Sequence, residues 1–393
     1  MRSLYLRLIL AGCVLGFGAA EAAARLWFFG TSVNGLARER EQWLAGGGPL
    51  TGFSERAQDG ATFRLHPLFG YVGIPGKLAV NKFGFFSGRE IELAGDRLRV
   101  KGAAPNALVV GIFGGSLALQ VASEERLFEA RLAPLFPGRE VVVVNFAMPG
   151  YAAPQTLAVY QYFRDVVNVA LFLDGLNEIW NPVRNNRLGF PPVFAKAEHF
   201  RLMSPEGAAE REEIVRLRHR LRLAAERSLI PLWRNLALAH ALWKVEERYS
   251  GGRIRELALA ERGADPFFPS GDPAALGVFE WELAHDQAAA LAGRQRQRFL
   301  HFLQPTAVTG RKRLTAEESE AVKKMPELPQ LVERAYPLLE ESARRRGVRS
   351  LTGLFDGVAE PVWIDVAHLN EQGIRLVQAE LVRGIGELGR GRR

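Results

Sequence analysis

The chain has 393 residues, of which 48% are hydrophobic, and it carries 51 basic and 43 acidic side chains. This length and apolar content predict a folded protein with a sizeable core and exclude a disordered chain. The net charge of +8 is a small excess, and it is spread through mixed runs such as "RLRHRLRLAAER", which are typical of solvated helix faces. The sequence has no basic stripe with interleaved aromatic residues, so we expect no nucleic-acid binding.

Residues 1–30 begin with a basic flank and continue as an apolar stretch. Two arginines precede residues 8–24, which as a helix would be about 26 Å long and would nearly span a bilayer. Glu21 is costly in such a helix, but Arg25 lies one turn later and can pair with it near the interface. The basic flank would stay in the cytoplasm, so we expect a single-pass membrane anchor and a periplasmic body.

The same segment is compatible with other roles than a membrane anchor. The "AAA" at 22–24 is compatible with a signal-peptidase site and hence with a cleaved signal peptide. The "LAGC" at 10–13 resembles a lipoprotein signal, but the apolar run continues well past Cys13, which argues against that reading. A buried helix of a soluble protein is a further alternative. The anchor and the cleaved signal both predict a body outside the cytoplasm.

Residues 31–106 are expected to lead into the main domain. The part 31–60 is charged and rich in glycine, as is typical of a juxtamembrane connector. The part 62–93 has short apolar runs separated by glycine and proline, which predicts a small set of short strands.

From residue 107 onward, short apolar runs alternate with helical patterns. These runs lack polar alternation, which indicates strands buried on both faces in a parallel sheet covered by helices. Residues 327–347 predict an amphipathic helix closed by Gly347. We therefore expect an α/β fold over 107–393, a three-layer α/β/α sandwich. Its five expected strands are 107–113, 140–146, 168–173, 299–305 and 347–355.

Residues 180–298 interrupt this alternation, and we expect them to form a mainly helical insertion. An apolar face packed on the domain, a lid over the site and a face resting on a membrane are all compatible with their pattern. The residues at helical spacing that define this face are Leu229, Leu232, Trp233, Leu236 and Trp243.

The turns after the strands are the places to search for chemistry, because ligands of open parallel sheets bind beyond the carboxyl ends of the strands. After the first strand come Gly114, Gly115 and Ser116. The glycines permit a sharp turn, and a serine that opens the next helix exposes its hydroxyl as a candidate nucleophile. A plain N-cap serine is the alternative.

Two further turns offer hydrogen-bond donors. Asn145 and then Gly150 follow the second strand, and a glycine amide that points into the crevice is a good oxyanion donor, although an ordinary Pro-Gly turn explains it equally well. Asn177 follows the third strand behind Gly175 and can offer its side-chain amide to the same place. A loop asparagine that caps the next helix is the alternative.

The last turn carries a carboxylate and an imidazole. Asp365 precedes His368 by three residues, and Asn370 is a candidate N-cap for the final helix. The carboxylate can accept the imidazole Nδ1 proton, which leaves Nε2 free to act as a base. A surface Asp and His in a loop remain the alternative. In chain order, the four turns supply a candidate nucleophile, two candidate hydrogen-bond donors, and finally a carboxylate with an imidazole base.

On these motifs the chain resembles the SGNH, or GDSL-like, hydrolases. The resemblance covers residues 107–174 and 299–388 but not the middle insertion, and "NKFGF" at 81–85 is similar to a segment of membrane-anchored bacterial members. The fold that it implies is the flavodoxin-like sandwich of that family. The family's serine, glycine, asparagine and histidine would here be Ser116, Gly150, Asn177 and His368, with Asp365 completing the triad.

The resemblance implies a serine esterase or acyl hydrolase that acts outside the cytoplasm on ester-linked acyl groups, such as O-acetyl groups of an envelope glycan, or on a lipid ester. Ser116, Gly150 and Asn177 would form the oxyanion hole. We expect no cofactor, and no metal site, because the chain has one cysteine and no close set of histidines. An O-acyltransferase, a non-catalytic envelope scaffold and a phosphate or nucleotide binder stay open. The sequence does not indicate the acyl chain length or the oligomeric state.

The chain departs from the family pattern at four positions. Gly115 replaces the usual aspartate, Gln120 stands where glycine is common, Ala147 replaces a frequent glycine, and Glu178 takes the place of the aspartate that commonly follows Asn177. None of these changes removes a catalytic group.

Overall fold

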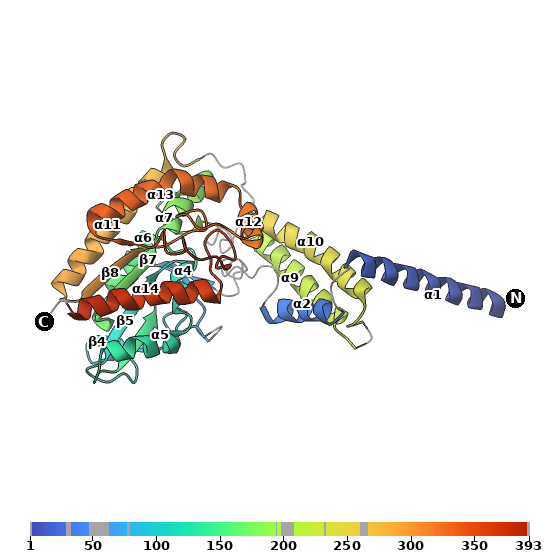
Figure 1. The fold of residues 1–393 in the computed structure, drawn as a ribbon, viewed down its shortest axis with the longest axis horizontal. Coiled ribbons are helices and arrows are strands. Elements are labelled where there is room, and N and C mark those ends of the chain that lie inside the picture. Colours follow the sequence, from blue (N-terminus) through green and yellow to red (C-terminus); the bar gives the residue numbers. More distant parts are fainter. Residues whose placement is uncertain are drawn as a thin grey trace. The chain divides into compact units, whose positions relative to one another are not determined.

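A computed structural model describes residues 2–28, 33–46, 63–76, 79–193, 195–197, 208–231, 233–259 and 266–390 (Figure 1). The chain forms two compact units. The first combines Met1–Asp59 with Leu202–Ala260, and the second combines Gly60–Arg201 with Glu261–Arg393.

A five-stranded parallel sheet forms the centre of the second unit, in the order β6-β5-β7-β8-β9. The strands β5, β6 and β7 of this sheet are buried along their whole length, as valine-rich runs without polar alternation require. The sheet confirms the five expected strands, although the last is much shorter than predicted. The strands are β5 (Leu108–Gly114), β6 (Val141–Asn145), β7 (Val169–Asp174), β8 (Arg298–Leu303) and β9 (Arg349–Ser350).

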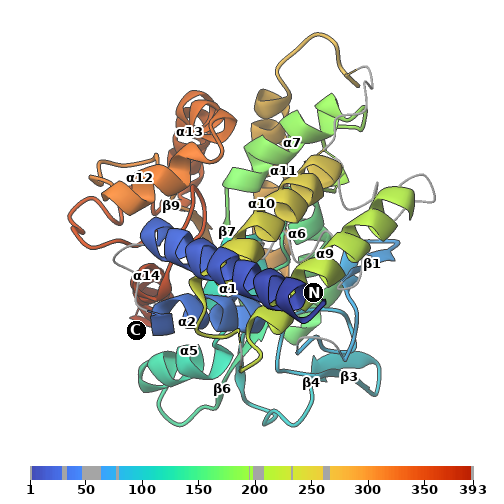
Figure 2. The same cartoon turned by 90° about the vertical axis from the view of Figure 1, so that its right-hand side faces the viewer.

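Helices cover both faces of this sheet, so the expected three-layer sandwich is present. One face carries α4 (Ser116–Ala122), α5 (Glu125–Leu132) and α14 (Glu371–Arg390). The other carries α6 (Ala153–Phe163), α7 (Leu176–Arg187), α11 (Pro273–Arg294) and α13 (Glu327–Arg346), and Figures 1 and 2 show α11 and α13 on the opposite side from α5. The helix predicted at 327–347 is α13, and Gly347 closes it with a φ of 70°. The short helices are α12 (Ala316–Lys323), η2 (Ala133–Leu135) and η3 (Arg164–Val166).

Two antiparallel hairpins precede the sheet, in agreement with the short strands expected at 62–93. They pair β1 (Phe63–His66) with β2 (Gly70–Gly73), and β3 (Ile91–Ala94) with β4 (Arg97–Val100). Aromatic contacts join this region to the sandwich, because the Phe85 ring packs on Phe146 and Phe163. The sandwich unit therefore begins near residue 60 and not at the expected boundary of 107.

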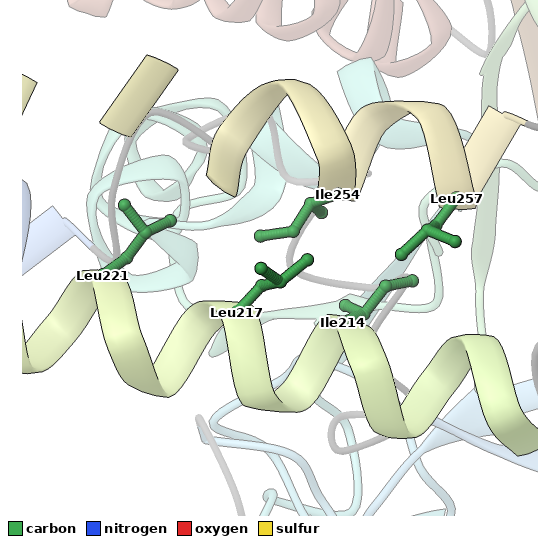
Figure 3. Packing of buried hydrophobic residues seen from close by; sticks show 5 residues of the cluster. All are labelled: Ile214, Leu217, Leu221, Ile254 and Leu257. Carbon is green, nitrogen blue, oxygen red and sulfur yellow. The ribbon is translucent and has the colours of Figure 1, made fainter. Parts of the chain in front are cut away.

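In the described residues of the first unit, the structure shows the helices α1 (Arg2–Trp27), α2 (Val33–Gly46), α9 (Ala208–Ser228) and α10 (Ala237–Leu259). The expected connector 31–60 thus contains a helix. Of the expected insertion 180–298, only 202–260 belongs to this unit, since α7 and α11 cover the sheet. The apolar contact between α9 and α10 (Figure 3) is made by Ile214, Leu217, Leu221, Ile254 and Leu257.

The apolar helical face expected between 229 and 243 is wrong in one respect, because the chain is not helical at residues 229–231 and 233–236. Helix α9 ends at Ser228, and α10 begins at Ala237. Pro231 explains the break, since proline lacks an amide proton and disfavours the helical conformation of the residue before it. Trp243 lies on α10 and is buried, whereas Leu232 lies outside the described residues.

Helix α1 contains the apolar stretch in which we expected a membrane span. Its Glu21 pairs with Arg25 at 2.8 Å and accepts hydrogen bonds from the amides of Ala237 and Leu238 at 3.0 and 2.8 Å. The carboxylate therefore caps the start of α10. Within the part of the chain that the structure describes, no helix combines the length and the apolar character of a membrane span, so the expected transmembrane helix is not supported.

Helices α7 and α11 pack closely because Gly277 has no side chain. A Cβ atom at this position would lie 1.8 Å from the carbonyl oxygen of Glu178. We expect Gly277→Ala to lower the free energy of unfolding by about 1–3 kcal/mol, despite the better helix propensity of alanine. Gly293→Ala in the same helix is the matched control, since a Cβ there meets nothing within 4 Å. It should raise stability by up to about 1 kcal/mol, and equal effects of both substitutions in urea denaturation would contradict the packing argument.

Candidate active site

Glycines with positive φ lie at the end of, or shortly after, three neighbouring strands of the sheet. Gly114, Gly150 and Gly175 have φ values of 149°, 76° and 137°, a region that favours glycine. Gly114 also needs to be glycine for space, because a Cβ there would lie 2.1 Å from the carbonyl oxygen of Leu173 on the adjacent strand. These turns bring the start of α4, the Gly150 turn and the start of α7 to the carboxyl edge of the sheet.

A hydrogen-bonded chain of serine, histidine and aspartate lies at this edge. Ser116 is the first residue of α4, and its Oγ lies 2.7 Å from Nε2 of His368. Nδ1 of His368 lies 2.7 Å from Oδ2 of Asp365. With the Nδ1 proton donated to the carboxylate, Nε2 is available to accept the serine proton. The structure thus brings together three predicted residues that span 252 positions of the chain.

The Asp365 carboxylate is well placed to stay ionised. Burial raises the pKa of Asp365, but the attraction of His368 and three hydrogen bonds outweigh it, so the net pKa lies below its ordinary value. Two of these bonds come to Oδ1 from the amides of Ala367 and His368, at 2.7 and 2.8 Å. The carboxylate therefore fixes both the imidazole ring and the backbone of its own loop.

Two side chains hold the histidine loop in place. Oε1 of Glu318 accepts hydrogen bonds from the amides of Val362 and Trp363 at 2.8 and 3.0 Å. Oε1 of Gln120 accepts the amide proton of Leu369 at 3.2 Å. Because Gln120 lies one turn after Ser116 in α4, the loop that carries the base is bound directly to the helix that carries the serine. Gln120 was recognised in the sequence only as a departure from the family pattern.

Two of the three predicted oxyanion donors, Gly150 and Asn177, lie next to Tyr151. The side-chain amide of Asn177, in the first turn of α7, donates a hydrogen bond to the carbonyl oxygen of Tyr151 at 2.7 Å, and Gly150 is the residue just before it. A Cβ on Gly115 would lie 2.3 Å from Nδ2 of Asn177. Asn177 therefore lies between the Gly115 turn and the Gly150 turn, beside Ser116.

Two buried tyrosines, which the sequence analysis missed, hold the Gly150 turn. The Tyr71 hydroxyl donates to the carbonyl oxygen of Pro149 at 2.5 Å, and the Tyr151 hydroxyl donates to the carbonyl oxygen of Tyr71. Burial raises the pKa of Tyr151, so this hydroxyl keeps its proton. Tyr71 belongs to β2, which means that the first hairpin, which precedes the parallel sheet in the chain, supports the site. No local pattern in the sequence signals a contact over 78 residues.

A pair of buried acids flanks Asn177. Asp174 accepts hydrogen bonds from Nε1 of Trp281 at 2.6 Å and from Nε2 of His301 at 2.7 Å. Glu178 accepts the amide proton of Gly175 at 2.7 Å, and burial together with the charge of Asp174 raises its pKa well above the ordinary value. Glu178 thus closes the first turn of α7 as a capping residue. Among the described residues, no group of three or more His, Cys, Asp or Glu side chains is arranged to hold a metal ion.

The raised pKa of Glu178 predicts a dependence of stability on pH. The folded protein keeps a proton on this group above its ordinary pKa of 4.5, whereas the unfolded chain releases it, so the free energy of unfolding falls as the pH rises through this range. The side-chain amide of Glu178→Gln does not titrate in this pH range. We expect it to raise the free energy of unfolding by about 1 kcal/mol or more near pH 8 and to lose this advantage near pH 4. Urea denaturation at both pH values tests this, with the exposed Glu317→Gln as the control, and an advantage that does not change with pH would contradict it.

Comparisons with known proteins give matches to solved structures only. No protein-family model matches the chain, and no curated protein sequence matches it. The acetyl xylan esterase AlAXEase is 11% identical, with 71% of this chain and 100% of that chain covered and a TM-score of 0.35. The lipase/acylhydrolase from Enterococcus faecalis is 11% identical, with 71% and 96% covered and a TM-score of 0.33. A catalytic mutant of Axe2, an acetylxylan esterase from Geobacillus stearothermophilus, is 10% identical, with 73% and 96% covered and a TM-score of 0.34.

Proposed function

We propose that the protein is a serine acyl hydrolase of the SGNH type, which cleaves ester-linked acyl groups. The observation that carries the proposal is the hydrogen-bonded chain from Ser116 through His368 to Asp365, with 2.7 Å at each step. A serine hydroxyl is a weak nucleophile until a positioned base removes its proton, and this geometry supplies the base and the group that orients it.

In the proposed reaction, Nε2 of His368 takes the proton of Ser116 as Oγ forms a bond to the ester carbonyl carbon. The tetrahedral intermediate collapses when the bond to the alcohol oxygen breaks and His368 returns the proton to that oxygen. Water then gives a proton to His368 and attacks the acyl-serine, and the acid leaves as Ser116 recovers its proton. Asp365 stabilises the imidazolium that forms twice in this cycle.

The oxyanion would be stabilised by the amides of Ser116 and Gly150 and by the side chain of Asn177. An asparagine amide carries two protons. One proton of Asn177 is used in the bond to Tyr151, and the second is left for the substrate oxygen. Each such donor contributes on the order of 3 kcal/mol to transition-state stabilisation in comparable sites.

The class of substrate and the place of action belong to the proposal as well. A basic flank followed by an apolar run in residues 1–24 supports export and action on acylated envelope glycan or lipid. Transfer of the acyl group to another hydroxyl is a close variant, in which that hydroxyl takes the place of water in the second half of the cycle. A scaffold or a phosphate binder has no use for the bond between Ser116 and His368.

The first test is hydrolysis of a short activated aryl ester. We expect Ser116→Ala and His368→Ala each to lower kcat/KM by about 10³-fold or more, and Asp365→Asn by a similar factor, because triad members act as a unit. Ser123→Ala is the matched control, since Ser123 caps the same helix α4 and is exposed. Labelling of the wild type by a fluorophosphonate, and its loss in Ser116→Ala, locates the nucleophile. Equal rates in the wild type and the triad variants would overturn the proposal.

A second test uses the space at Gly115. The Cβ of Gly115→Ala would lie 2.3 Å from Nδ2 of Asn177, so we expect Asn177 to move and kcat to fall by about 10²-fold, as when an oxyanion donor is lost. A double-mutant cycle with Asn177→Ala separates this effect from a general distortion. In the Asn177→Ala background, Gly115→Ala should cost little further activity. Strictly additive losses would contradict the role of Asn177 as a donor positioned by the glycine.

A further inference from the structure

Lys196 is a cation beside the proposed oxyanion donor, and the reaction described above does not use it. A Cβ on Gly150 would lie 3.0 Å from Cδ of Lys196 and 3.6 Å from its Cβ. The aliphatic part of the lysine therefore crosses the Gly150 turn. Its ammonium group extends only two bonds beyond Cδ, which keeps it within reach of a substrate held at that turn.

The backbone on both sides of Lys196 is fixed. Asn185 is fully buried, and its Oδ1 accepts the amide proton of Ala197 at 2.9 Å. Its Nδ2 donates to the carbonyl oxygen of Ala195 at 3.4 Å. Ala195 and Ala197 are themselves buried, so the half-buried Lys196 between them has a defined origin for its side chain.

Helix α7, which carries Asn185, also positions the Gly150 turn. Asn177, Asn181 and Asn185 recur at every fourth residue of α7 and so share one face of the helix. The Asn181 amide donates to the carbonyl oxygen of Gly150 at 2.8 Å, next to the bond from Asn177 to Tyr151. One rigid helix therefore sets the distance between the oxyanion donors and Lys196.

The charge of Lys196 is not used elsewhere in the described structure. No hydrogen bond or ion pair joins its ammonium group to another of the residues that the structure describes, although 26 ion pairs occur there. Glu178, an acid on the same helix α7, is buried, and burial together with the charge of Asp174 raises its pKa. An ammonium group without a partner among the described residues is a compact point charge that attracts anions of different shapes.

We propose that Lys196 is a specificity-determining residue that binds an anionic group of the substrate, a carboxylate or a phosphate, a few bonds away from the scissile ester. This inference rests on the proposed hydrolase function and narrows its substrates to acylated molecules that carry a negative charge near the ester. It also predicts that salt weakens substrate binding, because a partly exposed ion pair is screened.

Matched aryl acetates test this inference. The anionic probes are 3-acetoxybenzoate and 3-acetoxyphenyl phosphate, and the neutral probe is methyl 3-acetoxybenzoate. We expect Lys196→Met to lower kcat/KM for an anionic probe by about 5-fold, mainly through KM, and to leave the neutral probe within about twofold. Because each variant is compared with the wild type on the same probe, differences in leaving group cancel. The probe with the larger loss identifies the anion, carboxylate or phosphate. Lys101→Ala, which removes an exposed lysine after β4, controls for the change in net charge.

The outcomes separate the inference from the function on which it rests. Hydrolysis of the neutral probe that depends on Ser116, with equal effects of Lys196→Met on all three probes, would overturn the inference and leave the hydrolase intact. Hydrolysis that persists in Ser116→Ala would overturn the function. Calorimetric binding of the two anionic probes to Ser116→Ala, weakened about 5-fold by adding Lys196→Met, supports the subsite without turnover, and unchanged binding would count against it.

Discussion

The hydrogen bond between Ser116 and His368 is the interaction on which the rest of the site depends. It joins the residue that opens α4 to a loop that precedes α14, and it requires both segments to end at the same edge of the sheet. The parallel order of the strands brings them to that edge. Gln120 and Glu318 then fix the loop through backbone amides, so the imidazole need not be ordered at the moment of reaction. Such preorganisation is what makes a weak hydroxyl nucleophile useful.

Helix α7 is the second organising element of the site. Its asparagines bind the backbone of two separate segments, the Gly150 turn and the segment around Lys196. Its first turn carries Asn177, which approaches Gly115 so closely that a side chain there has no space. Two residues that differ from the motifs of the hydrolases that the sequence resembles thereby acquire a physical reason. Gly115 leaves room for the asparagine amide, and Gln120 supplies an acceptor that a glycine would lack.

Burying the polar side chains around α7 costs solvation free energy, and hydrogen bonds to neighbouring residues offset this cost. Asp174 accepts hydrogen bonds from Trp281 and His301. Burial and the charge of Asp174 raise the pKa of Glu178, which disfavours a second buried charge beside it. Buried polar groups need such partners, because an unsatisfied charge in the interior costs more than a single hydrogen bond returns. The stability of this region and the position of Asn177 are therefore set by the same contacts.

The sequence by itself determined the parallel sheet and the identities of the serine, histidine and aspartate. Valine runs such as residues 141–144 and the glycines after the strands are local signals, and sheet topology converts them into neighbours. Only the tertiary structure decided that residues 60–106 belong to the sandwich unit. It also showed that a helix occupies part of 31–60 and that the helical face at 229–243 is broken. Finally, it placed four further residues around the site: Tyr71, Gln120, Asn185 and Lys196. Their contacts join residues brought together by folding, across 78 residues for Tyr71 and 249 for Gln120. Periodicity and spacing in a sequence depend only on residues that are close together along the chain. Hydrogen bonds between residues that are 78 or 249 positions apart therefore cannot be predicted from such patterns.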